Sequence, residues 1–201
     1  MSDIPILLLA AGASNRMRGR DKLMEEVDGQ PLVARMARMA RAATDGAVLV
    51  TLPPQPHPRH GALKGLDIVP VEVPEAAEGM GASIRTGIGA LPEGARAVMV
   101  LLADLPDLRA ADLRTVLQAV KDRPDMQVWR GATEDGRAGH PIVFAAALFP
   151  DLAALAGDEG GRSVVAAAGD RMCLVPLPGQ QALADLDTPE AWAAWRAARG
   201  K

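Results

Sequence analysis

The sequence is poor in several features, and each shortage excludes a class of function. Cys173 is the only cysteine, so neither an internal disulfide nor a zinc site with several cysteine ligands can form. Aromatic residues make up 2% of the chain, too few to build the stacking platforms of single-stranded nucleic-acid binders. The net charge is −3, from 22 basic and 25 acidic residues, so no general attraction to nucleic acids or anionic membranes is expected. The sequence therefore predicts a small-molecule partner.

Long hydrophobic runs are also absent. The apolar run at residues 4–10 is far shorter than the ~20 residues that cross a bilayer, and no basic segment precedes it as in a secretion signal. We therefore expect this run to form a β-strand in a cytoplasmic protein that binds no membrane. With 201 residues, of which 49% are hydrophobic, the chain can bury one sizeable core, and we expect a single domain over residues 1–201.

Short apolar runs alternate along the chain with segments whose apolar residues recur at helical spacing. Strands are predicted at residues 4–10, 47–52, 67–71 and 98–103. Because the last of these runs is apolar at every position, helices are expected on both faces of a parallel sheet. Residues 128–144 predict two strands around a turn at Asp135 and Gly136, a small antiparallel excursion at one edge of the sheet. The predicted fold is α/β, a Rossmann-like three-layer sandwich with a mostly parallel sheet.

Apolar stripes at helical spacing predict helices after Pro31, around residues 113–120 and at residues 189–199. Asp107 is expected to cap the second of these helices. The third contains Trp192 and Trp195, which we expect to be packing anchors. Cys173 is expected in a buried strand, and the proline-rich residues 53–58 in a stiff surface loop.

Small residues followed by two cations come directly after the first predicted strand. Ala10, Ala11 and Gly12 would let backbone N–H groups approach phosphate oxygens, and Arg16 and Lys22 could neutralise the phosphate charge. The spacing is that of neither a P-loop nor a dinucleotide-binding fingerprint. The segment therefore predicts a phosphate site of another kind, and the alternative is an ordinary glycine turn with solvated charges.

Open α/β sheets bind ligands outside the carboxyl ends of their strands, and two aspartates are candidates for such a position. Asp104 directly follows the apolar run at residues 98–103, and Asp187 precedes the last predicted helix. Magnesium is held by one or two carboxylates together with substrate phosphates, so Asp104 beside a phosphate site predicts a Mg²⁺ site. An aspartate at the end of an apolar strand, such as Asp104, also occurs in phosphate-loop ATPases or as a helix cap. Asp187 could simply cap the last helix.

Five segments resemble, in order and across nearly the whole chain, the signature segments of the MobA-like NTP transferases. They read LLLAAGASNRMRGRDKL, EGMGASIRTGI, VLLADLPDL, GRAGHPIVF and LADLDTPEAW. With residues 157–162, GDEGGR, in place of a GDxGAR element, the set is most similar to the molybdenum cofactor cytidylyltransferases. The guanylyltransferase branch usually carries LAGG, where this chain has Ala11. The resemblance implies the nucleotide-diphospho-sugar transferase type of fold.

The resemblance implies a magnesium-dependent transfer of CMP from CTP to the phosphate of molybdopterin, with release of pyrophosphate. A phosphate monoester is largely dianionic at neutral pH, with a second pKa near ~6, so its attack needs no general base. The resemblance also implies a xanthine dehydrogenase or aldehyde oxidase-type molybdoenzyme as a possible recipient of the product.

Roles carry over from the resemblance to matching positions. The implied nucleotide-binding residues are Ala10, Ala11, Gly12, Arg16, Lys22, Gly79, Met80, Gly81 and Ser83. The implied catalytic residues are Lys22, Arg16 and Asp104, and the implied metal ligands are Asp104 and Asp187. The implied acceptor-side residues are His140, Pro141 and Arg162, although His140 could equally be a packed, hydrogen-bonded side chain.

The sequence departs from the family pattern at two places. Arg18 stands where a glycine is usual, and Ala103 and Leu105 replace the usual neighbours of the metal aspartate. Three other functions are compared with the implied one. The first is an enzyme of the same fold that uses another acceptor, or GTP as the donor. The second is a non-catalytic carrier of the cofactor, and the presence of Asp104, Asp187 and Lys22 argues against it. An NAD-linked oxidoreductase is excluded by the missing glycine spacing.

Overall fold

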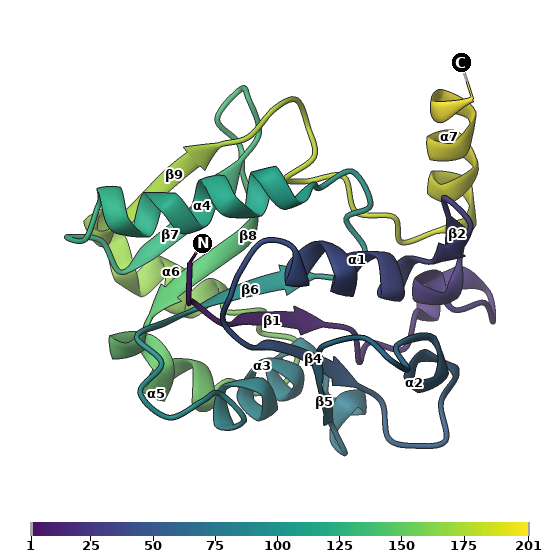
Figure 1. Cartoon of the computed structure of the whole chain (residues 1–201), viewed down its shortest axis with the longest axis horizontal. Coiled ribbons are helices and arrows are strands. Elements are labelled where there is room, and N and C mark those ends of the chain that lie inside the picture. Colours follow the sequence, from purple (N-terminus) through teal and green to yellow (C-terminus); the bar gives the residue numbers. More distant parts are fainter. Residues whose placement is uncertain (1, 201) are drawn as a thin grey trace.

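A seven-stranded mixed sheet runs through the centre of the molecule in this computed structural model, which describes residues 2–200 (Figure 1). The strands are β1 (Ile6–Leu9), β4 (Val48–Leu52), β5 (Val69–Glu72), β6 (Ala97–Leu102), β7 (Val128–Ala132), β8 (Ala138–Ala145) and β9 (Met172–Pro176). Their order across the sheet is β5-β4-β1-β6-β8-β7-β9. The four predicted parallel strands are therefore confirmed.

The antiparallel excursion is confirmed, but its predicted position was wrong. Strand β8 is antiparallel to both of its neighbours, β6 and β7, whereas β7 pairs in parallel with β9. Strands β7 and β8 thus lie inside the sheet, and β9 forms its edge. The sequence could not place β9, because a short strand carries no mark of the neighbour with which it pairs.

Helices cover both faces of the sheet (Figure 1). They are α1 (Leu32–Arg41), α2 (Pro58–Ala62), α3 (Met80–Gly89), α4 (Ala110–Asp122), α5 (Phe149–Ala153), α6 (Arg162–Ala168) and α7 (Pro189–Arg199). Alternate residues of β1 point to opposite faces, so Ile6 and Leu8 join the core under α1 and α4, whereas Leu7 joins the core under α3, α5 and α6. The predicted three-layer sandwich is confirmed. Within residues 2–200, no helix has the length and apolar composition that crossing a membrane requires.

The start of α4 differs from the prediction. The backbone N–H of Arg109 donates to the side chain of Asp112 (2.8 Å), so the acidic cap lies inside the helix and is not Asp107. Asp107 instead accepts a hydrogen bond from Nε1 of Trp195 (2.9 Å). Trp192 is fully buried and meets Trp195 edge to face at 5.6 Å between ring centroids, as expected of packing anchors.

Two further local predictions need correction. Cys173 is only half-buried, because β9 is an edge strand and part of its surface has no covering layer. The proline-rich segment is not only loop: His57 caps α2, which starts at Pro58, by accepting a hydrogen bond from the backbone N–H of Arg59. Proline suits the first turn of a helix because N–H groups in that turn have no acceptor within the helix, so the missing N–H of proline costs no hydrogen bond.

Candidate active site

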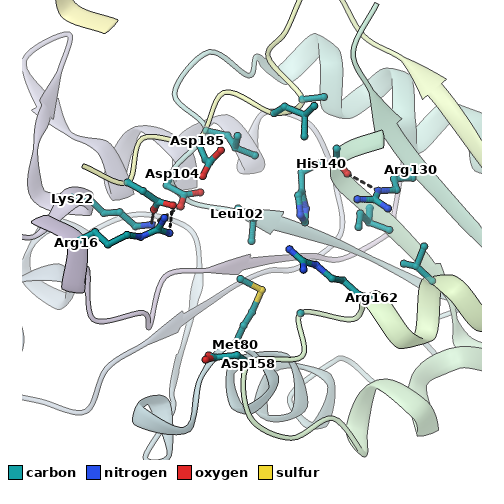
Figure 2. Close-up of a pocket in the computed structure, with 18 residues that line it drawn as sticks. Arg16, Lys22, Met80, Leu102, Asp104, Arg130, His140, Asp158, Arg162 and Asp185 are labelled. Atoms are coloured by element: carbon teal, nitrogen blue, oxygen red, sulfur yellow. Dashed lines mark hydrogen bonds and ion pairs between the residues drawn. The ribbon is translucent and has the colours of Figure 1, made fainter. Parts of the chain in front are cut away.

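Two cavities meet at the carboxyl ends of β1 and β6. The loop cavity, of about 510 Å³, is lined by the small residues after β1 and by residues 76–83. The arginine cavity, of about 430 Å³, is lined by Arg130, His140 and Arg162 and by the segment that leads into α7 (Figure 2). Five residues line both cavities, namely Lys22, Met80, Leu102, Asp104 and Asp158. A ligand in one cavity can therefore touch a ligand in the other beside Lys22 and Asp104.

The loop after β1 is open toward the loop cavity. Ala10 continues the sheet, since its N–H donates to the backbone oxygen of Thr51 (3.1 Å). Ala11 is buried against Val73 and Ala82. A side chain added at Gly12 would meet nothing within 4 Å, so the space beside this backbone is free for a ligand. Ala10, Ala11 and Gly12 all line the loop cavity, as the phosphate site predicts.

Arg59, which the sequence analysis missed, holds the loop in place. Its side chain is 1% exposed, and its Nη1 donates to the carbonyl of Ala10 (2.6 Å). Its Nε and Nη2 donate to the two carboxylate oxygens of Asp21 (2.8 and 2.6 Å), and Nη2 also reaches Oγ of Ser14 (3.2 Å). Burial raises the pKa of Asp21, but the hydrogen bond and charge of Arg59 outweigh it and hold this pKa below its ordinary value. One buried guanidinium thus joins both ends of the loop, and no local sequence pattern marks it.

Lys22 lies between the two aspartates predicted to bind metal. Its Nζ is 2.5 Å from Oδ2 of Asp104 and also forms an ion pair with Asp187, which in turn pairs with the exposed Arg16. Burial lowers the pKa of Lys22, but the two carboxylates outweigh it and raise this pKa above its ordinary value. Burial likewise raises the pKa of Asp187, and Lys22 then brings it below its usual range. The predicted catalytic and metal residues therefore form one charged cluster at the junction of the cavities.

The helix-capping roles that were alternatives for the two aspartates are filled by other residues. Thr188 caps α7, because its side chain accepts from the N–H of Ala191 (3.2 Å), so Asp187 is free to face Lys22. The backbone N–H of Leu186 donates to the carbonyl of Asp104 (3.1 Å), which joins the two acidic segments. Asp185 lines the arginine cavity as well, and burial together with Asp187 raises its pKa. The spacing of two aspartates around one leucine was the signal that could have added Asp185 to the site.

The residues present fit a divalent cation only in part. Within residues 2–200, no group of three or more histidine, cysteine, aspartate or glutamate side chains is arranged to hold a metal. Oδ1 of Asp104, however, is buried and accepts no hydrogen bond from the described part of the chain. A cation bound by Asp104 and Asp187 would satisfy this oxygen, and substrate phosphates would have to complete its ligand shell.

Two segments implied by the resemblance contact each other across the loop cavity. The N–H of Gly81 donates to the carbonyl of Gly157 (2.9 Å). A side chain at Gly79 would clash with Oδ1 of Asp158, and the φ of +119° at this position also favours glycine. Met80 and Ser83 line the loop cavity on the same segment, and Ser83 is buried. Asp158, which belongs to the GDEGGR segment but was not predicted as a site residue, lines both cavities.

His140 and Arg162 both line the arginine cavity, but the buried Pro141 does not. Nδ1 of His140 is buried and has no hydrogen-bond partner within residues 2–200. Burial, assisted by the nearby charge of Arg130, lowers the pKa of His140 to about 4, so its ring is neutral at neutral pH. The backbone N–H of His140 donates to the carbonyl of Ala182 (2.8 Å), which ties this strand to the segment that carries Asp185. Arg130 was not predicted, since an isolated arginine in a strand has no motif around it.

Comparisons with known proteins identify the family of this chain. The family model described as the MobA-like NTP transferase domain matches residues 6–172. The molybdenum cofactor guanylyltransferase of Pseudomonas aeruginosa is 32% identical over 188 residues, which cover 92% of this chain and 90% of that protein. The purine catabolism protein PucB of Bacillus subtilis is 27% identical, with 92% of each chain covered.

Two other matches differ in extent. The bifunctional protein GlmU of Clavibacter sepedonicus is 31% identical over 150 residues, and the aligned part of this chain spans only 29% of its length. Among solved structures, Rv0371c of Mycobacterium tuberculosis has a TM-score of 0.78 at 26% identity, covering 96% of this chain and 98% of its own. Because the family model covers most of the chain, and a relative that is 32% identical aligns with nearly all of it, the chain belongs to the MobA-like NTP transferase family and to the class of nucleotidyltransferases.

Proposed function

We propose that this chain transfers CMP from CTP to the phosphate of molybdopterin and releases pyrophosphate. The observation that carries the proposal is the junction of the two cavities at Lys22 and Asp104. Nucleotidyl transfer needs two substrates that meet at one phosphorus atom, beside groups that neutralise the phosphate charge. Two joined cavities with a lysine and two aspartates at their junction suit that requirement. We also propose that residues 1–201 act as one domain, because the central sheet joins β1, near one end of the chain, to β9, near the other.

The loop cavity suits the nucleoside triphosphate. The open space at Gly12 allows phosphate oxygens to approach the backbone, and Lys22 lines the same cavity. Arg16 lines the arginine cavity instead and pairs there with Asp187, which also pairs with Lys22. In the reaction, an oxygen of the acceptor phosphate forms a bond to the α-phosphorus. The bond from that phosphorus to the bridging oxygen breaks, and its electron pair leaves with pyrophosphate. Lys22 and Arg16 stabilise the negative charge of the departing group.

Asp104 and Asp187 are the residues that would hold Mg²⁺. The unpartnered Oδ1 of Asp104 supports this assignment, because a hard cation prefers carboxylate oxygens. When bound, Mg²⁺ supplies positive charge to the phosphates. A second structure of Rv0371C, which aligns with this chain at 23% identity and a TM-score of 0.73, is a complex with manganese. That likeness establishes the shared fold and leaves the metal of this chain a proposal.

The preference for CTP rests on Ala11. This residue lines the loop cavity, is 3% exposed and packs against Val73 and Ala82, and we infer that a second glycine at this position would leave more room in the cavity wall. One methyl group discriminates by ~1 to 3 kcal/mol, which corresponds to a preference of roughly 10- to 200-fold for the smaller base. The name of the Pseudomonas aeruginosa relative favours GTP as the donor and a molybdenum cofactor as the acceptor, so transfer of GMP is the second candidate. Delivery of the product to a xanthine dehydrogenase or aldehyde oxidase-type molybdoenzyme stays a prediction.

The test is to incubate the protein with molybdopterin, Mg²⁺ and each nucleoside triphosphate in turn, and to measure pyrophosphate and the dinucleotide product. We expect kcat/KM for CTP to exceed that for GTP by roughly 10- to 200-fold. The matched variant Ala11→Gly should reduce this ratio. Equal values for CTP and GTP, or a higher value for GTP, would show that the donor assignment is wrong. Pyrophosphate release that does not depend on molybdopterin would show that molybdopterin is not the acceptor.

A further inference from the structure

Two arginines converge on the arginine cavity without an acidic partner. Arg130 comes from β7, in the interior of the sheet, and Arg162 is the first residue of α6. Figure 2 shows both side chains reaching toward the cavity from different elements. Within residues 2–200, neither guanidinium has a carboxylate at ion-pair distance, whereas Arg16, Arg59 and Arg85 each have one. The fold therefore brings two positive charges to one cavity and leaves them unneutralised.

The two guanidiniums are close enough to affect each other. Burial lowers the pKa of Arg130, and the charge of Arg162 lowers it further. Within the described residues, the side chain of Arg130 makes a single hydrogen bond, from Nε to the carbonyl of Gly139 (2.9 Å), which fixes its orientation and leaves the Nη1 and Nη2 donors unused. Two repelling arginines cost stability unless an anion lies between them. Their free N–H groups have the fork geometry that binds carboxylates and phosphates.

This pair of arginines lies away from the reacting groups. Figure 2 shows Arg130 and Arg162 on one side of Leu102 and the Lys22–Asp104 cluster on the other. The attacking phosphate must lie beside Lys22 and Asp104, because the nucleotide reaches the arginine cavity only at that junction. Asp158 and Asp185 also line this cavity, and within residues 2–200 neither forms an ion pair with Arg130 or Arg162.

We propose that Arg130 and Arg162 bind an anionic group of the acceptor that is distinct from the phosphate that attacks. The acceptor then carries negative charge at both of its ends. One end reacts at Lys22 and Asp104, and the other, a phosphate, carboxylate or metal-oxo group, is held between the two guanidiniums. The identity of this cavity as the acceptor site rests on the proposed function above. Arg130 is in this case a specificity-determining residue that motif comparison did not reveal.

The first test uses inorganic phosphate as the probe and needs no turnover. The Nε–H NMR signals of Arg130 and Arg162 are assigned with variants and followed during a phosphate titration. Because these signals report on the two side chains themselves, phosphate that binds elsewhere in the molecule does not contribute to the measured affinity. We expect both signals to shift with one shared Kd. In Arg162→Gln, the Kd read from the Arg130 signal should rise about 10-fold, as expected for loss of a charged hydrogen-bonding partner.

Arg162→Gln suits this test because Arg162 is exposed and makes no hydrogen bond within the described residues, so its replacement should not disturb folding. Arg130→Lys is the second variant, since it keeps the charge and loses the fork of donors. Arg123→Gln is the control, because Arg123 pairs with Asp125 at the surface, outside the cavity. Signals that do not move, or an affinity that Arg162→Gln leaves unchanged, would overturn the proposal.

The second test is kinetic, with molybdopterin as the acceptor. We expect Arg130→Lys and Arg162→Gln to raise the acceptor KM about 10-fold while KM for CTP and kcat stay within about twofold of the unmodified protein. A fall in kcat without a change in acceptor KM would show that the pair acts on the reacting phosphate, and would overturn the proposal. If molybdopterin is not used at all, the proposed acceptor is wrong, and the phosphate titration still decides whether the anion site exists.

Discussion

Arg59 is the single residue on which the shape of the loop after β1 most depends. Its guanidinium is buried and satisfies Asp21, Ser14 and the carbonyl of Ala10 at once. A buried charge that loses its partner is costly, because the remaining group stays in a low-dielectric environment. The loop also contains Ser14 and Arg18 in the left-handed region, with φ of 55° and 53°. Arg18 thus adopts the conformation that the usual glycine would favour, and the pairing of Arg59 helps to hold it.

We expect Arg59→Met to lower the free energy of unfolding by about 3 to 5 kcal/mol, since it removes both the cation that pairs with Asp21 and the donor to the Ala10 carbonyl. The activity should fall further than the folded fraction, because the loop that lines the nucleotide cavity is released. Urea denaturation and kcat/KM measured on the folded protein check both statements. Arg38→Met serves as the control, because Arg38 is exposed and bonds only Gln30. An unchanged denaturation midpoint in Arg59→Met would contradict the role of this ion pair.

His140 gives the second prediction at the residue scale. Its pKa is about 4 in the folded protein, against 6.5 for the ordinary side chain. The unfolded chain therefore takes up a proton first as the pH falls, so stability should decrease between about pH 6.5 and pH 4 and show no further contribution from His140 below pH 4. The loss attributable to His140 should be about 3 kcal/mol. Urea denaturation from pH 8 to pH 4 should show this loss in the unmodified protein and not in His140→Gln. A difference between the two that is constant with pH would contradict it.

At the scale of elements, the start of α7 positions one of the two aspartates. Thr188 caps this helix, and Asp187 directly precedes the cap. Trp192 anchors the same helix in the core below α1 and α4, where it is fully buried. The direction of the chain at Asp187 is thus fixed by a cap on one side and by the bond from Leu186 to Asp104 on the other.

We expect Thr188→Ala to cost about 1 kcal/mol of stability, as for the loss of other threonine caps. It should also lower kcat/KM, because the backbone that presents Asp187 to Lys22 becomes less constrained. Thermal unfolding and the pyrophosphate assay measure the two effects. Thr115→Ala is the matched control, since Thr115 lies on the exposed face of α4 and its hydroxyl bonds only the carbonyl of Ala111. If the two variants have equal activity, Thr188 does not help to position Asp187.

At the scale of the whole molecule, the charged cluster at the junction joins segments from both ends of the chain. Asp104 at the end of β6 and Asp187 before α7 share Lys22 from the first loop. Two carboxylates in contact with a single lysine carry one uncompensated negative charge, which Arg16 partly balances from the exposed rim. This excess of negative charge favours a cation at the junction.

We expect Asp104→Asn to lower kcat/KM by about 100-fold or more, because it removes charge from the groups that would hold the metal at the reacting phosphorus. Chelation of divalent cations should abolish transfer in the unmodified protein, and added Mg²⁺ should restore it. Pyrophosphate release as a function of Mg²⁺ concentration measures both. Asp122→Asn, at the exposed end of α4, is the control. Unchanged Mg²⁺ dependence in Asp104→Asn would show that Asp104 is not a metal ligand.

The sequence by itself determined the class of fold and the edge of the sheet at which the site lies. A run that is apolar at every position, such as residues 98–103, indicates a strand that is covered on both faces. Because the carboxyl ends of parallel strands meet at one edge, the residues that follow β1 and β6 had to come together. That rule sufficed to place Gly12, Lys22 and Asp104 in one site. The roles carried over from the resemblance remain predictions that the experiments above test.

Only the tertiary structure decided which distant residues complete the site. Arg59 lies 38 residues from its partner Asp21, and Arg130 meets Arg162 because β7 and α6 border the same cavity. The inner position of β7 and β8 also depended on the pairing of β9, which no local pattern indicated. The physical reason is the same in each case. Strand register and ion pairing are chosen by the free energy of the assembled fold, and a residue's near neighbours in sequence carry no record of that choice.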